Sequence, residues 1–219
     1  MKDYMKNILA LEKVPLHLRE TVCDEMCHGI EVSNLAVLLA KELGESEEFC
    51  DEIAIAGVLH DIGKLKLTKY LYTEDGLVVE QLKYVRLHSA QSYEIISDAG
   101  FSQEIAQGVY HHHENYDGSG YPDNLRGEAI PWMARLLRVC DVFAALTSNR
   151  SYRNAFEPRT ALEIMIDEVA DYDMEVFLAF QRVIHNEVFL MGLDQMKLIR
   201  DNHQMETMGM FEKELRLLV

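Results

Sequence analysis

Apolar residues recur at helical spacing along most of this chain of 219 residues. From Leu16 to Leu43 they return every three or four positions, and the pattern stops at Gly44, a typical residue just after a helix. The same spacing predicts further helices at 48–59, 79–98, 102–113, 130–147, 157–169, 173–191 and 194–218. Strand signals are weak, and only Lys64 to Tyr72 alternates as an extended segment does. The pattern therefore predicts an all-α fold.

No internal repeat, low-complexity tract or linker divides the chain, which favours a single helical bundle. With 4 Pro and 12 Gly, the composition argues against both disorder and a β-sandwich. Two loops rich in turn residues are expected at 65–78 and 115–130. We predict an N-terminal helical extension over 1–20, a central domain over 21–190, and a C-terminal helical tail over 191–219 that packs on the same domain.

The formal net charge of −16 argues against binding to a nucleic-acid polymer, because such binding needs a basic face. It does not argue against a small anionic substrate, since divalent cations supply positive charge where a site needs it. There is no apolar run long enough to span a membrane and no signal-peptide pattern at the first residues. Four cysteines are too few and too scattered for a disulfide framework. The expected location is the cytoplasm.

Histidines and acids cluster at two places about fifty residues apart in the sequence. One is the run His111-His112-His113-Glu114, and the other is the pair His60-Asp61. Such groups are costly in a core but natural at a metal, because neutral imidazole is the commonest metal-binding side chain. Together they predict a metal site that several helices assemble, although a lone His-Asp pair could equally be a core histidine beside a turn-forming aspartate.

The order of these motifs resembles a known family. His28, His60-Asp61 followed by Gly63-Lys64, and then Asp141 resemble the HD superfamily of metal-dependent phosphohydrolases. Further elements resemble its HD-GYP subfamily, whose members hydrolyse the bacterial second messenger cyclic di-GMP: His88, His112-His113-Glu114, Asp117-Gly118-Ser119-Gly120-Tyr121-Pro122, and the segment 135–153. The resemblance covers roughly residues 20–185 and implies that 21–190 is a catalytic HD-GYP domain.

The candidate ligands are too many for one ion that also keeps positions for water and substrate, so the site is expected to hold at least two. The resemblance implies that His28, His60, Asp61 and Asp141 hold one ion and that Asp61, His88, His112 and His113 hold the other. Asp24 lies four residues before His28, on the same helical face, and is a candidate ligand for a third ion or else an exposed acid. The resemblance favours iron or manganese, and the ligand types do not exclude zinc, nickel or cobalt.

The remaining motif residues have expected roles around this centre. His111 is a bystander, and Glu114 is expected to orient a ligating imidazole. Lys64 is predicted to be catalytic, as a cation that stabilises negative charge on the phosphoryl oxygens, together with the bridging Asp61. For substrate binding the candidates are Tyr121 as a stacking platform for guanine, Gly120 as a point of close approach, and Arg150 and Arg153 as guanidinium forks. Loop packing is the alternative for these four.

The expected reaction is hydrolysis of cyclic di-GMP to the linear dinucleotide pGpG, and onward to GMP, by a hydroxide that bridges the two metal ions. Three alternatives stay open: another cyclic dinucleotide such as cyclic GMP-AMP, a slow or inactive cyclic di-GMP sensor, and a mononucleotide nucleotidase. A homodimer or a regulatory protein is an expected partner. The chain departs from the family at Ser92, where glycine is usual, and in the segment after Lys64, which lacks a usual proline.

Overall fold

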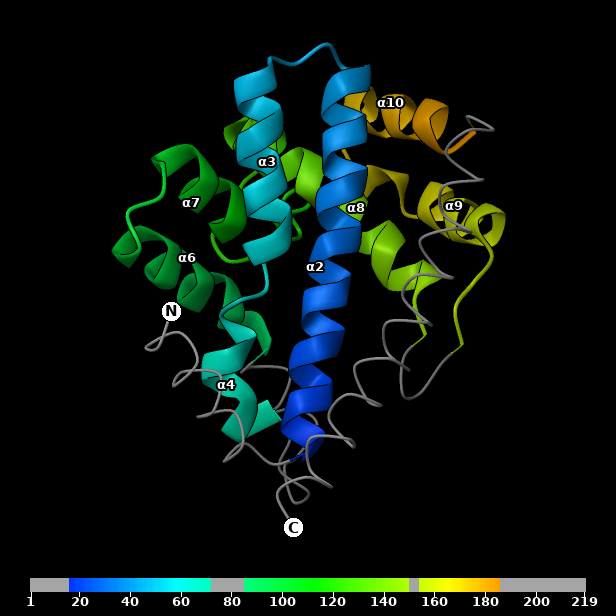
Figure 1. Cartoon of the computed structure of the whole chain (residues 1–219). Helices are drawn as coiled ribbons and strands as arrows, with labels where there is room; N and C mark the ends of the chain where they lie inside the picture. Colours follow the sequence, from blue (N-terminus) through cyan, green and yellow to red (C-terminus); the bar gives the residue numbers. More distant parts are fainter. Residues whose placement is uncertain (1–15, 72–84, 150–153, 186–219) are drawn as a thin grey trace. The chain divides into compact units, whose positions relative to one another are not determined.

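A computed structural model describes residues 16–71, 85–149 and 154–185, and every regular element in these ranges is helical (Figure 1). The predicted all-α fold is confirmed. The α-helices are α2 (Leu16–Glu42), α3 (Glu47–Leu59), α4 (Lys64–Leu71), α6 (His88–Asp98), α7 (Gln103–Tyr110), α8 (Trp132–Thr147), α9 (Pro158–Asp167) and α10 (Met174–His185). Two short 3-10 turns, Gly127–Ala129 and Val169–Asp171, complete the set.

The helices α2 and α3 form an antiparallel hairpin whose tight contact brings two site segments together. Gly44 ends α2 with a φ of 79°, a left-handed conformation that favours glycine. Ser46 then caps α3 by accepting a hydrogen bond from the Phe49 amide at 3.1 Å. Farther along, a Cβ added to Gly57 would lie 2.6 Å from the Cα of Ser33, so the two backbones touch. The close approach sets the end of α3 beside the middle of α2.

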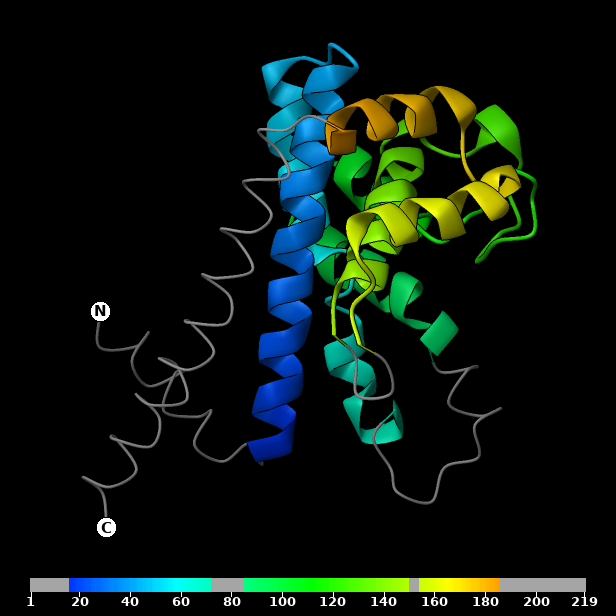
Figure 2. The ribbon, with the colours of Figure 1, turned by 90° about the vertical axis from the view of Figure 1, so that its right-hand side faces the viewer.

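The most buried helix is α8, which contacts α2, α3, α7 and α9. Figure 2 shows α8 and α9 on one side of the upright α2. Along α8, Leu136, Leu137 and Phe143 are fully buried, and the Phe143 ring packs edge-on against Phe180 with centroids 5.2 Å apart. Burying side chains of this size contributes about 1.5–3 kcal/mol each, so α8 is held firmly in the core.

The expectation of an extended segment over Lys64 to Tyr72 was wrong, because residues Lys64–Leu71 form the helix α4. The turn that follows Asp61 already has helical hydrogen bonds, with the Lys64 amide donating to the Asp61 carbonyl at 2.9 Å and the Lys66 amide to the Gly63 carbonyl at 3.1 Å. Leu67 is buried while Leu65 is 37% exposed. The two leucines therefore lie on different sides of a short helix, and only the side with Leu67 faces the interior. The loop predicted at 65–78 is helical as far as Leu71.

Other boundaries shift by smaller amounts. The helix predicted over 102–113 ends at Tyr110, and the three histidines form the turn after it. The helix predicted over 79–98 is interrupted within the described residues, because Val85 and Arg86 are helical, Leu87 forms a turn, and α6 runs from His88 to Asp98. Predictions for residues 1–15, 72–84 and 186–219, including the C-terminal tail, lie outside the described residues, and the domain boundaries stay predictions. The chain divides into two compact units, Met1–Phe180 and Gln181–Val219.

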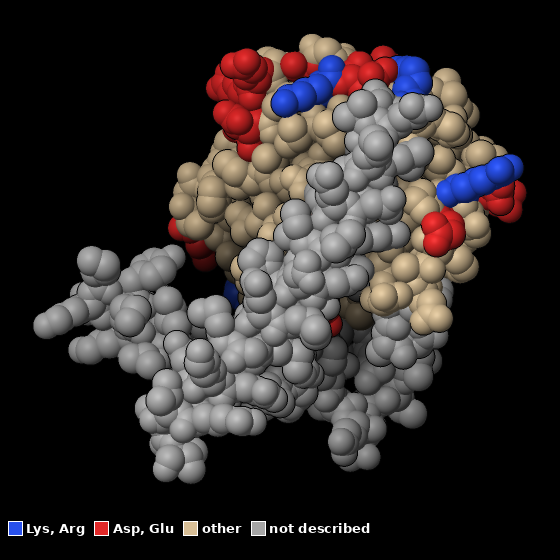
Figure 3. Space-filling view, turned by 45° about the vertical axis from the view of Figure 1, so that its right-hand side comes forward, with Lys and Arg blue, Asp and Glu red and all other residues tan. Residues whose placement is uncertain are grey.

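Two surface observations bear on the partners expected from the sequence. No helix in the described parts of the chain is both long enough and apolar enough to cross a membrane. Figure 3 shows acidic side chains, with Lys or Arg side chains among them, at the end of the hairpin where α2 turns into α3, and Glu42, Glu47, Glu48 and Asp51 are exposed in this stretch.

Candidate metal centre

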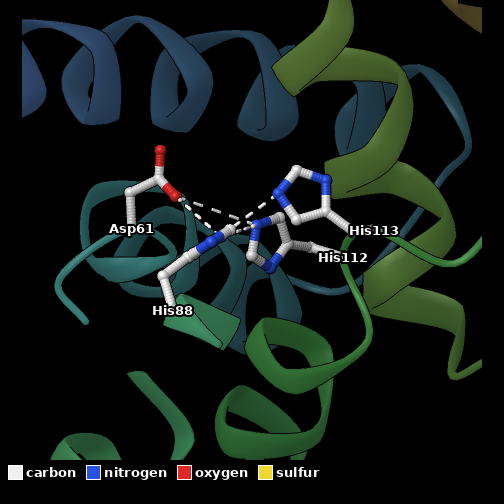
Figure 4. A group of neighbouring side chains, drawn as sticks. All are labelled: Asp61, His88, His112 and His113. Carbon is white, nitrogen blue, oxygen red and sulfur yellow. Dashed lines mark hydrogen bonds and ion pairs between the residues drawn. The ribbon is translucent and has the colours of Figure 1, made fainter. Parts of the chain in front are cut away.

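Five separate segments bring the predicted ligands together in the interior. His28 comes from α2, His60 and Asp61 from the end of α3 and the turn after it, and His88 from the start of α6. His112 and His113 come from the turn after α7, and Asp141 comes from α8. Their potential ligand atoms form two groups, each within 4.8 Å: His28 with His60 and Asp141, and Asp61 with His88, His112 and His113 (Figure 4).

The carboxylate of Asp61 lies between the two groups. Its Oδ2 is 3.2 Å from Nε2 of His60, and its Oδ1 is 3.0 Å from Nε2 of His88. The side chain is almost fully buried. Because each oxygen is directed toward a different group, Asp61 has the geometry that a ligand shared by two cations needs.

Backbone carbonyls set the orientation of three of the imidazoles. Nδ1 of His60 donates to the Gly57 carbonyl at 2.8 Å, and Nδ1 of His112 donates to the Val109 carbonyl at 2.5 Å. His88 makes the same kind of bond to the carbonyl of Val85. Each acceptor lies three residues before its histidine. With the proton held on Nδ1, the lone pair of Nε2 is directed into the site, which is the arrangement of a metal-binding histidine.

The imidazole nitrogens of one group lie close together. Nε2 of His88 is 3.3 Å from Nε2 of His112 and 3.2 Å from Nε2 of His113 (Figure 4). In the other group, Nε2 of His60 faces two carboxylates, with Oδ2 of Asp61 at 3.2 Å and Oδ1 of Asp141 at 3.6 Å. Converging imidazoles and carboxylates of this kind fit divalent metal ions, and the mixture of the two suits first-row transition metals.

The protonation states differ between the two groups. Burial lowers the pKa of His113 to about 3 and the pKa of His112 well below its usual value, so both imidazoles are neutral and ready to ligate. Burial also opposes the charged form of His60, but Asp61 and Asp141 outweigh it and raise its pKa to about 10. In the metal-free site His60 therefore carries a proton at neutral pH, which a metal ion would have to displace.

Lys64 is held by two carboxylates at the edge of the centre. Its Nζ lies 2.6 Å from Oδ2 of Asp61 and 3.1 Å from Oε2 of Glu25. Burial opposes its charge, but Asp61 and Glu25 outweigh burial and raise the pKa of Lys64, so the ammonium persists. Sequence reasoning missed Glu25, although its place three residues before His28 on one helix was a usable signal. Asp24 is exposed and belongs to neither ligand group.

Glu114 anchors the loop that follows the histidine run. Its Oε1 accepts from the Asp123 amide at 2.7 Å, and its Oε2 accepts from the Leu125 amide at 3.1 Å. The nearest imidazole to its carboxylate is that of His111, at 3.6 Å, and His111 belongs to neither ligand group. The expectation that Glu114 orients a ligating imidazole is therefore wrong, since two backbone amides take its oxygens.

Replacing Glu114 with glutamine is expected to lower the free energy of unfolding by about 1 kcal/mol, because the amide NH₂ would face one of the two part-buried backbone N–H groups and leave it without its acceptor. Urea unfolding of the wild type and the variant measures the difference. Glu128→Gln is the matched control, since Glu128 is exposed in the same loop. Equal losses in the two variants would contradict the anchoring role.

Tyr121 and Gly120 fasten the same loop to the ligand-bearing turn. The Tyr121 ring stacks on the imidazole of His113 with centroids 4.7 Å apart, and the Tyr121 amide donates to the His113 carbonyl at 3.1 Å. A Cβ added to Gly120 would lie 2.5 Å from that same carbonyl oxygen, so only glycine fits. The guanidinium carbon of Arg86 lies 5.2 Å from the centre of the Tyr121 ring. Sequence reasoning missed Arg86, for which the only signal was its place near His88, and the predicted Arg150 and Arg153 lie outside the described residues.

The fold and this centre define an HD-type helical domain, and the family comparison agrees. The model of the HD domain family matches residues 3–176, so the chain belongs to the HD domain family. The membership of the HD superfamily that the sequence predicted is thereby confirmed, and the finer assignment to the HD-GYP subfamily stays a prediction.

Several curated relatives are similar over the same region. The chain is 42% identical over 134 residues to "Cyclic di-GMP phosphodiesterase response regulator RpfG" of Xanthomonas campestris pv. campestris, which covers 60% of this chain and 35% of the relative. It is 32% identical over 159 residues to "Cyclic di-GMP phosphodiesterase PA4108" of Pseudomonas aeruginosa, and the match covers 72% of this chain and 38% of the relative. It is 34% identical over 153 residues to "3'3'-cGAMP-specific phosphodiesterase 1" of Vibrio cholerae, covering 68% and 36%. The chain thus spans little more than a third of the length of these relatives.

Solved structures share the fold at lower identity. The Bdellovibrio bacteriovorus protein Bd1817, described as a HDG"Y"P protein, superposes with a TM-score of 0.61 at 22% identity, over 74% of this chain and 53% of that one. The Vibrio cholerae cyclic GMP-AMP phosphodiesterase V-cGAP3 superposes with a TM-score of 0.60 at 19% identity, over 78% and 48%. At these identities the likeness concerns the fold alone.

Proposed function

We propose that this chain is a metal-dependent phosphodiesterase that hydrolyses cyclic di-GMP to pGpG, and onward to GMP. The observation that carries the proposal is the position of Asp61, whose two oxygens are directed at two separate groups of buried metal-ligand side chains. The names of the relatives in Xanthomonas and Pseudomonas support the substrate.

In this proposal two ions are held by the two ligand groups, with Asp61 shared, and iron or manganese is the favoured metal. When bound, the ions would lower the pKa of a water molecule towards about 7 and polarise the phosphoryl group. His60, His88 and His112 would ligate through Nε2, because backbone carbonyls hold their Nδ1 protons. A third ion at Asp24 stays a prediction, since that side chain is exposed.

Lys64 has two tasks that its contacts support. Its ammonium holds Oδ2 of Asp61 at 2.6 Å and so fixes the rotation of the shared carboxylate. The same positive charge lies beside the shared carboxylate and would stabilise the charge that develops on the phosphoryl oxygens of a bound substrate. Glu25 completes the arrangement by holding the ammonium from the other side at 3.1 Å.

Substrate recognition is assigned to the rim of the centre. Tyr121 stacks on His113, one of the proposed ligands, and its ring would offer an aromatic face to a nucleobase of the substrate. Gly120 permits the close approach of this loop. Arg150 and Arg153 stay the proposed phosphate or guanine contacts. The cytoplasmic location and a homodimer or regulatory protein partner also stay predictions.

Cyclic GMP-AMP is the second candidate substrate, because a relative that is 34% identical is named as specific for it. Incubating the Mn²⁺- or Fe²⁺-loaded protein with each cyclic dinucleotide and separating the products by chromatography distinguishes the two. We expect pGpG from cyclic di-GMP at the higher rate. No product from either substrate with either metal would contradict the proposal, and tight binding without turnover that Asp61→Asn leaves unchanged would indicate a sensor instead.

A further inference from the structure

A buried hydrogen bond joins the two segments that carry the Asp61 and His88 ligands. The backbone amide of Gly63 donates to Oγ of Ser92 at 2.8 Å. Ser92 is fully buried, and Gly63 is buried as well. The bond spans 29 positions in the sequence and connects the turn after α3 to the helix α6.

The backbones of the two segments are in direct contact at this point, and no side chain would fit between them. A Cβ added to Gly63 would lie 2.6 Å from the Ser92 amide nitrogen and would also collide with the His88 carbonyl oxygen. Both of those atoms are backbone atoms of α6, which cannot move as the end of a side chain can. The turn therefore rests directly on the first turns of α6, and the hydroxyl of Ser92 supplies the directional contact there.

The contact lies close in sequence to both ligands. Gly63 is two residues after Asp61, and Ser92 is four residues after His88, so Ser92 and His88 share a face of α6. Across the same junction, Oδ1 of Asp61 is 3.0 Å from Nε2 of His88. A shift of the turn along α6 would change that separation directly.

The amide of Gly63 depends on this hydroxyl. The neighbouring amides of Ile62 and Lys64 donate to the carbonyls of Leu59 and Asp61 within the turn. Within the described residues, the bond recorded for the Gly63 amide is the one to Ser92. Removing the hydroxyl leaves a buried donor without an acceptor, which the turn relieves only by moving.

We propose that Ser92 is a positioning residue of the metal centre, whose hydroxyl fixes the Asp61–Lys64 turn against α6 and thereby sets the distance from Asp61 to His88. The inference rests on the metal-binding part of the proposed function and is independent of the substrate. The affinity for one ion, the one that Asp61, His88, His112 and His113 would hold, is expected to depend on Ser92.

Titration of the metal-free chain with Mn²⁺ against a competing chelator tests this role. Ser92→Ala is expected to weaken one of two Mn²⁺ equivalents by about 10- to 100-fold, the usual effect of losing a group that orients metal ligands. The matched control is Ser97→Ala on the same helix, because Oγ of Ser97 makes no hydrogen bond within the described residues. This control should bind both equivalents as the wild type does.

A merely structural role is excluded by a double-mutant cycle. In a His88→Ala background the affected equivalent is already lost, so adding Ser92→Ala should leave the affinity of the remaining equivalent unchanged. Ser92→Cys keeps the side-chain size but offers a weak acceptor, and it should follow Ser92→Ala. It serves as the test if the alanine variant does not fold, as judged by its helical circular dichroism.

Folded Ser92→Ala or Ser92→Cys protein that binds both equivalents with wild-type affinity would overturn the proposal. Weakening of the remaining equivalent by Ser92→Ala in the His88→Ala background would also overturn it, because the effect would then not pass through the distance from Asp61 to His88. If the wild type itself binds no Mn²⁺, the metal-binding part of the proposed function fails, and this inference fails with it.

Discussion

Asp61→Asn is expected to lower kcat/KM for cyclic di-GMP by about 10³-fold or more, because the substitution removes a carboxylate whose two oxygens lie close to both ligand groups. Asparagine has nearly the same size but offers a single oxygen, and its NH₂ would face either His60 or His88. Both are now within 3.2 Å of a carboxylate oxygen. A loss of that size corresponds to about 4 kcal/mol of transition-state stabilisation.

Steady-state rates measured with product separation give the ratio of kcat/KM values. The matched control is Asp51→Asn, since Asp51 is exposed on α3, the helix that leads into the same turn. It should retain the wild-type rate. An Asp61→Asn variant that keeps a tenth or more of the wild-type kcat/KM would contradict the bridging role.

Lys64→Met is expected to lower kcat by about 10²–10³-fold, the effect of removing one preorganised group that stabilises developing charge. Methionine retains most of the aliphatic side chain, so the packing changes little while the ammonium is lost. Asp61 and Glu25 then face each other without the cation that now lies 2.6 Å and 3.1 Å from them. The shared carboxylate is left free to rotate.

Comparison with Lys66→Met separates this effect from a general loss of positive charge. Lys66 lies two residues farther along α4 and is 46% exposed, with Glu94 as its partner at 3.5 Å. Its replacement should leave kcat within about twofold, since exposed ion pairs contribute little. Equal losses in the two lysine variants would contradict a specific role for Lys64.

Much of this site could be predicted from the sequence because its ligands lie in short motifs. The resemblance to the HD superfamily, carried by His60-Asp61, the run at His112-His113 and the later Asp141, identified residues that the structure gathers into two groups. The helix end marked by Gly44 also agrees with the pattern to within a few residues. Short motifs and helix ends of this kind can be predicted from a single sequence.

Contacts between distant segments could not be predicted in the same way. The bond from Gly63 to Ser92 and the pair of Lys64 with Glu25 join residues 29 and 39 positions apart, and each depends on how helices pack. The alternation after Lys64 suggested an extended segment, but hydrogen bonds carried over from the preceding turn make it helical. Glu114 was assigned to an imidazole because two backbone amides 9 and 11 positions later cannot be seen as its partners in a sequence.

Metal analysis of the protein purified without oxygen tests the central claim most directly, when it is carried out on the wild type and Asp61→Asn side by side. The arrangement of Asp61 between the two groups predicts at least two equivalents of iron or manganese per chain in the wild type. It predicts at most one equivalent in the variant. A wild type with one equivalent or none, or a variant with the full wild-type content, would contradict a centre built around a shared Asp61.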